Sequence, residues 1–306
     1  LGMKTLLIYS LTGILAVATG LLCVNLLQPG EVDPSIKEAI IASQHESGLG
    51  SIDQAMQTAN DGWTNLIQIF HRMIPPNLFL AAAEGQLLGL ICFGLPFGFF
   101  LAHIKPELRA SQLLFWQGLQ DIILKITHYI LGFAPIGIFG LVTPTIAQSG
   151  FDTFWLMGGF ALTVFLALGI HALLTLPLLL RVLGGISFLD HYRAMSPALL
   201  TAFSTASSSA TLPVTMECTN KKVGVSKKIS GFTLPLGATL NMDGTALFEC
   251  VVVIFLAQFF GVEMGWVTQF TVVLLALLTS VGVAGIPSAS LVAILVILQA
   301  VGFDDD

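Results

Sequence analysis

Long apolar runs, separated by short polar connections, dominate the sequence. A helix needs about 20 mostly apolar residues to cross a hydrocarbon core about 30 Å thick. Four stretches meet this requirement, at about 5–28, 78–104, 112–147 and 153–180. A fifth stretch, 229–260, is long enough but contains two acids, Asp243 and Glu249. The pattern therefore predicts an all-α membrane protein with several spans.

Two further apolar stretches do not fit a single span. Residues 194–216 carry no charge but are rich in Ser and Thr, and both flanks are basic. Residues 266–303 also carry no charge, and at about 1.5 Å per residue one helix of that length would be nearly twice as long as the core is thick. We expect each stretch to form a helical hairpin that re-enters the face it left. The alternative is a pair of ordinary kinked spans.

Together these stretches predict one membrane domain over 1–306. We expect a first helix at 1–28, an extracellular loop at 29–77, scaffold helices within 78–147, a helix at 153–184, a first hairpin at 188–221, a broken helix at 229–260 and a second hairpin at 266–303. Irregular backbone at membrane depth survives only where protein or water satisfies its polar groups. Paired broken segments, arranged as inverted repeats, are typical of the binding site of a transporter.

The basic residues indicate how the chain is oriented. Tracing the spans in order places nine of them on one face: Lys4, Lys105, Arg109, Arg181, Arg193, Lys221, Lys222, Lys227 and Lys228. Because Lys and Arg concentrate in cytoplasmic loops, this face should be cytoplasmic. We therefore expect a multi-pass protein surrounded by lipid in a plasma membrane or a bacterial inner membrane.

Composition supports a membrane location and argues against some partners. Charged residues make up only 10% of the chain, whereas a soluble domain carries about 25%. The formal net charge is −6, so nothing resembles the basic patch that nucleic acid requires. The four cysteines are scattered through apolar runs and have no paired spacing. We expect them to act as small apolar residues.

Asp243 is the residue that most clearly indicates chemistry. A carboxylate at the centre of a span costs about 2.5–3.5 kcal/mol, so it should face protein or water. Pro235, Gly237 and Gly244 weaken the helix around it and would free backbone carbonyl groups. With the amide of Asn241, these oxygens could hold a sodium ion. The alternative is a buried aspartate that caps a helix break.

The expected tip of the first hairpin offers a second candidate site. Ser207, Ser208 and Ser209 provide hydroxyl groups just before a short apolar run. The N-terminus of a half-helix there would carry a partial positive charge suited to a carboxylate. The alternative is that these small residues only let two helices pack closely.

Three motifs resemble those of a known transporter family. They are Phe203-Ser204-Thr205-Ala206-Ser207-Ser208-Ser209-Ala210-Thr211-Leu212-Pro213, Asn241-Met242-Asp243-Gly244-Thr245 and Ala284-Gly285-Ile286-Pro287. In this order they are similar to the dicarboxylate/amino acid:cation symporter family, which includes the excitatory amino acid transporters. The resemblance implies a homotrimer in which an elevator-like transport domain moves against a static scaffold. It covers the family's third helix through its second hairpin, so we expect this chain alone not to transport.

The resemblance also implies roles for individual residues. One sodium site would involve Tyr9, Thr12, Asn241 and Asp243; a second would use backbone oxygens of Gly237 and Asn241; a third would involve Thr239, Met242, Ser280, Val281 and Val283. A small anionic substrate would be held by Ser207, Ser208, Ser209, Thr245, Gly285, Ile286 and Ser290. The second hairpin would act as the external gate.

Several positions depart from the family pattern. Gly13 replaces an expected hydroxyl beside Thr12, and Val283 replaces a residue that is often Thr. Ala206 stands where archaeal aspartate transporters carry an arginine. Glu249 resembles the proton-carrying glutamate of proton-coupled members, because an acid within a span is cheaper to keep protonated. The alternative is that Glu249 is a shielded polar residue paired with a neighbour.

The function expected on these grounds is symport of an acidic amino acid or a C4-dicarboxylate, driven by Na⁺ or H⁺ entry, without another cofactor. A neutral amino acid symporter of the same family is the alternative in the same class. An intramembrane enzyme, built for example from Ser208 with His171 or His191, and an ion channel are alternatives from other classes. The sequence shows no Gly-x-Ser-x-Gly motif around these serines, so a transporter is favoured over an enzyme.

Overall fold

The computed structural model describes residues 2–32, 74–83, 87–133, 135–137, 139, 140, 143, 152–282 and 290–301. Most of the expected loop 29–77, and the tip of the second hairpin with Val283, Gly285 and Ile286, lie outside these ranges. Within them the chain is helical, without a strand, which confirms the all-α class. The chain divides into two compact units. Of the described elements, the second unit holds α5–α7, and the first holds α1, α9 from Leu156 onward and the helices that follow it.

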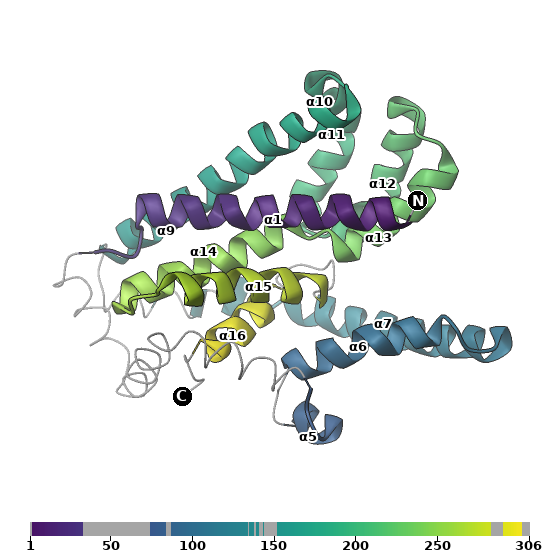
Figure 1. The fold of residues 1–306 in the computed structure, drawn as a ribbon, viewed down its shortest axis with the longest axis horizontal. Helices are drawn as coiled ribbons and strands as arrows, with labels where there is room; N and C mark the ends of the chain where they lie inside the picture. The colour runs from purple at the N-terminus through teal and green to yellow at the C-terminus, as the bar shows by residue number, and fades with distance from the viewer. Residues whose placement is uncertain are drawn as a thin grey trace. The chain divides into compact units, whose positions relative to one another are not determined.

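The first unit contains most of the ordered helices (Figure 1). They are α1 (Gly2–Leu27), α9 (Asp152–Ile170), a π-helical segment (His171–Thr175), α10 (Leu176–Gly184), α11 (Phe188–Thr205), α12 (Ser208–Cys218), a second π-helical segment (Thr219–Val223), α13 (Lys227–Leu240), α14 (Asp243–Phe260), α15 (Trp266–Gly282) and α16 (Ser290–Ala300). The second unit contains α5 (Leu78–Ala83), α6 (Leu87–Leu101) and α7 (Pro106–Leu131).

The core of the first unit forms around α14. Leu247 and Val251 on this helix are fully buried, and α1, α15 and α16 all contact it. The buried residues of α1 recur every three to four positions, from Thr12 through Ala16 to Val24, so one face of α1 lies along α14. Gly20 lets the two helices approach closely, because a Cβ there would lie 3.1 Å from the Leu247 carbonyl oxygen.

Outside this core, large apolar side chains are exposed on many helices. In water such a surface would be unfavourable, but hydrocarbon solvates it. Within the described part of the chain, three helical stretches are long and apolar enough to cross a membrane: Gly2–Leu27, Met157–Gly184 and Lys227–Phe260. The described structure therefore fits a multi-pass membrane protein.

Some helix bounds differ from the sequence-based expectation. α7 begins at Pro106, ahead of the apolar stretch at 112–147, and ends at Leu131. Its first turns carry charged residues, including Glu107. These residues lower the mean hydropathy, so the apolar stretch begins later than the helix. The helix expected at 153–184 is continuous over Met157–Gly184 but contains a π-helical segment at His171–Thr175.

Each of the two regions expected to form a hairpin holds a pair of helices in contact. In the first, α11 and α12 pack together and are joined by Ala206 and Ser207, with Ala206 in the left-handed conformation. In the second, α15 contacts α16. A hydrogen bond of 2.6 Å from Ser230 Oγ to Asn220 Oδ1 joins the end of the first hairpin region to α13.

Candidate functional site

The helix break between α13 and α14 is the foundation of the candidate site. α13 ends at Leu240, and Asn241 and Met242 adopt non-helical backbone angles before α14 begins at Asp243. Pro235 lies within α13 and lacks the hydrogen that would bond the preceding turn. The break thus places Asn241 outside regular helix and Asp243 in the first turn of α14, both next to the middle of α1.

An oxygen cluster forms where this break meets α1. Thr12 Oγ1 lies 3.0 Å from Asn241 Oδ1, 3.3 Å from Asp243 Oδ1 and 3.1 Å from the backbone oxygen of Tyr9. A hydroxyl has a single hydrogen, so Thr12 can donate to only one of these three acceptors. The cluster therefore holds more lone pairs than hydrogens, which is the environment that a hard cation satisfies.

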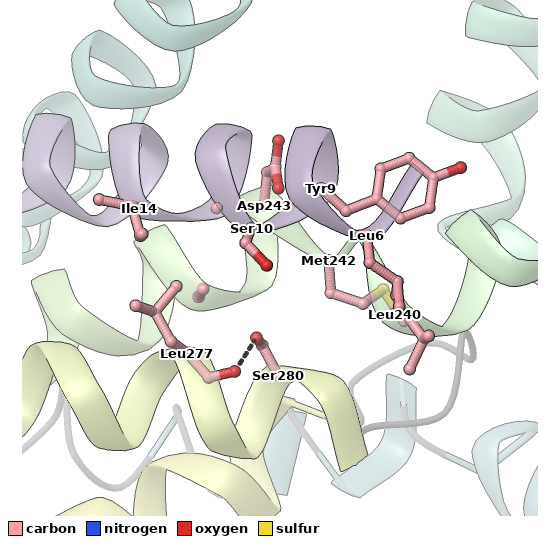
Figure 2. Close-up of a pocket in the computed structure, with 11 residues that line it drawn as sticks. Leu6, Tyr9, Ser10, Ile14, Leu240, Met242, Asp243, Leu277 and Ser280 are labelled. Atoms are coloured by element: carbon pink, nitrogen blue, oxygen red, sulfur yellow. Dashed lines mark hydrogen bonds between the residues drawn. The ribbon is translucent and has the colours of Figure 1, made fainter. Parts of the chain in front are cut away.

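A cavity of about 330 Å³ opens beside the cluster, between α1, α14 and α15. Asp243, Met242 and Ser280 line it together with Ser10 and Gly13. In Figure 2 the side chains of Ser10 and Ser280 point into the space between α1 and α15. The cavity thus gives a small ion or water a place next to an acidic group.

His171 also contacts Asp243, from the π-helical segment between α9 and α10. Its Nε2 lies 3.3 Å from Asp243 Oδ2, and the two side chains are 5% and 12% exposed. From the sequence, His171 was a candidate only as a partner for Ser208, but in the structure it contacts Asp243 instead. No sequence signal indicated this contact, because the two residues are 72 positions apart.

The other residues of the expected cation sites are distributed around this cluster. The Tyr9 hydroxyl points elsewhere and donates to the Thr233 carbonyl oxygen at 2.7 Å. Gly237 accommodates that ring, since a Cβ there would lie 2.7 Å from the Tyr9 hydroxyl. The Gly237 carbonyl oxygen accepts from the Asn241 amide at 3.0 Å, which closes the last turn of α13.

The residues of the expected third cation site lie on three elements. Thr239 is exposed near the end of α13, Met242 lies in the break, and Ser280 is buried in α15. Ser280 Oγ donates to the Leu277 carbonyl oxygen at 3.0 Å (Figure 2). Val281 follows in the same helix. Of these residues, Met242 and Ser280 share the cavity beside Asp243.

The serines expected at the tip of the first hairpin lie at the start of α12. Ser207 is the N-cap, and its hydroxyl accepts from the Ala210 amide at 3.3 Å. Ser208 and Ser209 are exposed in the first turn. Thr245 is half-buried in α14 and Ser290 is half-buried at the start of α16. Among the expected substrate residues, Ser208 and Ser209 therefore present their side chains at the surface of the first unit.

Glu249 lies fully buried on α14, two turns after the break. Thr279 Oγ1 lies 2.8 Å from Glu249 Oε2 and also 2.8 Å from the Leu275 carbonyl oxygen. One hydroxyl hydrogen cannot serve both oxygens. If it bonds the Leu275 carbonyl, as helical threonines commonly do, the second contact requires a proton on Glu249. The geometry is therefore well suited to a carboxyl group that carries a proton.

The described helices are those of a multi-pass membrane protein built around a broken, acid-containing helix. The model of the sodium:dicarboxylate symporter family matches residues 1–306, so the chain belongs to this family.

Three relatives with known names are transporters, and they match this chain over different lengths. A proton/glutamate-aspartate symporter of Escherichia coli is 30% identical over 99% of this chain and 67% of its own length. An excitatory amino acid transporter of Caenorhabditis elegans is 32% identical over 99% of this chain and 66% of its own length. The neutral amino acid transporter B(0) of mouse is 40% identical over 72% of this chain and 40% of its own length. The chain thus spans about two thirds, or less, of these relatives.

Membership of this family decides between a transporter and an enzyme. The family and these relatives are transporters, so the protein is a transporter homologue and not an enzyme. Its location in a membrane follows from the family and from the apolar helices.

Proposed function

We propose that the full-length protein is a secondary active symporter that couples uptake of an acidic amino acid or a C4-dicarboxylate to entry of Na⁺, H⁺ or both. The observation that carries this proposal is the oxygen cluster of Thr12, Asn241 and Asp243 at a helix break beside a cavity. Broken helices with acidic groups at membrane depth are where secondary transporters bind their coupling ions.

In this proposal the cation binds among oxygens that the break and α1 provide. Asp243 supplies the negative charge, and Thr12, Asn241 and the Tyr9 carbonyl supply neutral oxygens. The Gly237 and Asn241 carbonyls would contribute to a second site, and Thr239, Met242, Ser280, Val281 and Val283 to a third. The substrate carboxylates would bind Ser207, Ser208, Ser209, Thr245, Gly285, Ile286 and Ser290.

Glu249 is the group proposed to carry a proton. It is fully buried, and among the described residues its Oε1 has no hydrogen-bond partner. A buried, singly bonded carboxylate is costly unless it is neutralised. A protonated Glu249 can cross the membrane with its helix as an uncharged group, and release of the proton on the other side would drive transport.

The proposed assembly is a homotrimer, in which a transport domain moves as an elevator. This rests on membership of the family and not on contacts between chains. The first unit, which contains the cation cluster and both hairpin regions, would form part of the moving domain.

Uptake of labelled aspartate into proteoliposomes tests the function. We expect the full-length protein to accumulate aspartate when a sodium or a proton gradient is imposed alone. Asp243→Asn should abolish sodium-driven uptake, because an amide cannot balance the cation's charge. Glu249→Gln should abolish proton-driven uptake and leave substrate exchange intact, because the amide resembles the protonated acid but cannot release a proton.

The outcomes separate the two coupling ions. Loss of sodium-driven uptake in Asp243→Asn alone would assign coupling to the cation cluster. Loss in Glu249→Gln alone, under a proton gradient, would assign it to Glu249 and make the sodium sites wrong. Accumulation under neither gradient would contradict the proposal for acidic substrates.

A neutral amino acid is the second candidate substrate. It is favoured by one observation, the 40% identity to the neutral amino acid transporter B(0) of mouse over 72% of this chain. Competition of labelled aspartate uptake by unlabelled alanine, serine or glutamine distinguishes the two. Strong competition by a neutral amino acid and weak competition by glutamate would favour this candidate.

A further inference from the structure

His171 is a buried polar residue that the proposed ion sites do not include. It is 4% exposed and lies at the start of the π-helical segment between α9 and α10. Among the described residues, its Nε2 has one partner, Asp243 Oδ2 at 3.3 Å, and its Nδ1 has none. A buried imidazole with a single contact, directed at the acid of the candidate cation site, requires an explanation.

The two oxygens of Asp243 have different environments. Oδ2 faces His171, whereas Oδ1 faces Thr12 at 3.3 Å. Oδ1 is also the oxygen that borders Gly13, since a Cβ there would lie 3.7 Å away. The histidine thus contacts the oxygen that points away from the Thr12 cluster and leaves the other oxygen within it.

The contact determines which ring nitrogen carries a hydrogen. An ionised carboxylate only accepts hydrogen bonds, so Nε2 must donate to Asp243 Oδ2. A hydrogen on Nδ1 would be a buried donor without a partner in the described part of the chain, which is unfavourable. The geometry therefore favours the ring with its hydrogen on Nε2 alone.

The π-helical segment explains how the imidazole reaches Asp243. The Leu176 amide donates to the His171 carbonyl oxygen five residues earlier, which makes a wider turn than an α-helix. Such turns frequently occur at functional sites. Here the widened segment contacts α1, and His171 lies between that helix and the start of α14.

We propose that His171 is a positioning residue for the coupling cation, holding Asp243 Oδ2 so that Oδ1 faces Thr12 and Asn241. The proposal rests on the cation site proposed above and adds a residue to it. Hard cations prefer oxygen ligands, so the imidazole nitrogen acts through Asp243 and does not itself bind the ion. Hydrogen bonds to ligating carboxylates tune metal sites in this way.

Two substitutions distinguish positioning from simple packing. His171→Gln keeps an N–H group close to the position of Nε2, whereas His171→Leu fills similar space without a donor. In the full-length protein, sodium binding is measured in detergent, without substrate, from the rise of the unfolding temperature with sodium concentration. We expect His171→Leu to raise the half-saturating sodium concentration by about 10- to 100-fold, and His171→Gln to stay close to wild type.

A second readout separates sodium binding from general damage. At saturating sodium, the apparent affinity of both variants for labelled aspartate should match wild type. Their unfolding temperatures in sodium-free choline buffer report whether they are folded. If His171→Leu does not fold, His171→Met provides another variant without a donor.

The outcomes also separate this proposal from the proposed function. If Asp243→Asn abolishes the sodium response while His171→Leu and His171→Gln both respond as wild type, the positioning role is wrong and the cation site stands. Equal losses in the Leu and Gln variants would also overturn it, because the donor would then not matter. If Asp243→Asn itself keeps the sodium response, the cation site is wrong and the positioning role falls with it.

Discussion

At the scale of single residues, Thr12 shows why the candidate site suits a cation. Its one hydroxyl hydrogen faces three oxygen acceptors within 3.3 Å. The hydroxyl can donate to only one of them at a time, and water or an ion can compensate the others. A bound cation would interact with all of them at once, so occupation of the site should stabilise the contact between α1 and the helix break.

Gly13 offers a direct way to strengthen this site. A Cβ at this position would lie 3.7 Å from Asp243 Oδ1 and 3.3 Å from the end of the flexible Leu277 side chain, which can shift. A serine there would add a hydroxyl oxygen to the cluster. We expect Gly13→Ser to lower the half-saturating sodium concentration by about fivefold, which corresponds to about 1 kcal/mol for one added polar contact.

Gly13→Ala is the matched control for this prediction, because it fills the same space without the oxygen. Both variants are compared by the sodium dependence of thermal unfolding. Equal sodium affinities in the Ser and Ala variants would show that position 13 does not contribute to the cation site.

The sequence alone indicated some of these residues but not their partners. The acid at 243 stands out because charges are rare within apolar spans, and the resemblance drew Thr12 and Asn241 to the same site. His171 did not stand out, because a histidine in an apolar run reveals nothing about a partner 72 positions away. The sequence also did not indicate that the Thr279 hydroxyl faces two acceptors, Glu249 Oε2 and the Leu275 carbonyl oxygen, because this depends on interatomic distances.

At the scale of elements, α1 is attached to the α13–α14 helix pair at two levels. Near its middle, Thr12 contacts Asn241 and Asp243. At its last turn and just beyond it, the Gln258 side chain donates to the Val24 carbonyl oxygen at 3.1 Å and accepts from the Gly30 amide at 3.2 Å. The two attachments hold α1 in a single register along α14.

Gly30 is essential to the second attachment. A Cβ there would lie 2.5 Å from the Phe255 carbonyl oxygen and 2.7 Å from the Phe259 amide nitrogen, and these backbone atoms cannot easily move. We expect Gly30→Ala to destabilise the protein by about 1–3 kcal/mol, as overpacking commonly does. The lower unfolding temperature of the purified variant would be the evidence.

Gly169→Ala serves as the control for that substitution. Gly169 lies in α9, where nothing is within 4 Å of an added Cβ, and alanine favours a helix by up to about 1 kcal/mol. Its unfolding temperature should stay the same or rise. A fall of equal size in both variants would attribute the effect to loss of glycine in general.

The presence of helices could be predicted from the sequence more readily than their local geometry and bounds. Apolar runs of sufficient length determine that the chain is helical in a bilayer, where other open structures leave backbone groups unsatisfied. The π-helical turns at His171–Thr175 and Thr219–Val223 each accommodate an extra residue, and hydropathy does not register this. The first turns of α7, from Pro106, lie outside the apolar run at 112–147, because hydropathy leaves out charged residues that favour a helix as well as many apolar ones do.

At the scale of the whole molecule, the distribution of lysines predicts the orientation in the membrane. Lys222 is exposed in the second π-helical segment, and Glu263 is exposed in the connection between α14 and α15. These two connections are expected on opposite faces. We expect Lys222→Cys to react with a membrane-impermeant maleimide only from the cytoplasmic side, and Glu263→Cys only from the outside.

The native cysteines do not obscure this measurement. Cys23, Cys218 and Cys250 are buried and Cys92 is partly buried, so a protein without added cysteines should label weakly. Labelling of both new cysteines from the same side would contradict the orientation and, with it, the expected number of spans between them.

The double attachment of α1 also matters for experiments that follow motion. Two spin labels, one on the exposed face of α1 and one at a half-buried position of α14, would report a separation that both the Thr12 cluster and the Gln258 contacts hold constant. Such a pair would provide an internal reference distance. Its distance distribution should stay narrow and unshifted through a transport cycle. Changes seen in other label pairs could then be assigned to motions of other elements, without a separate reference molecule.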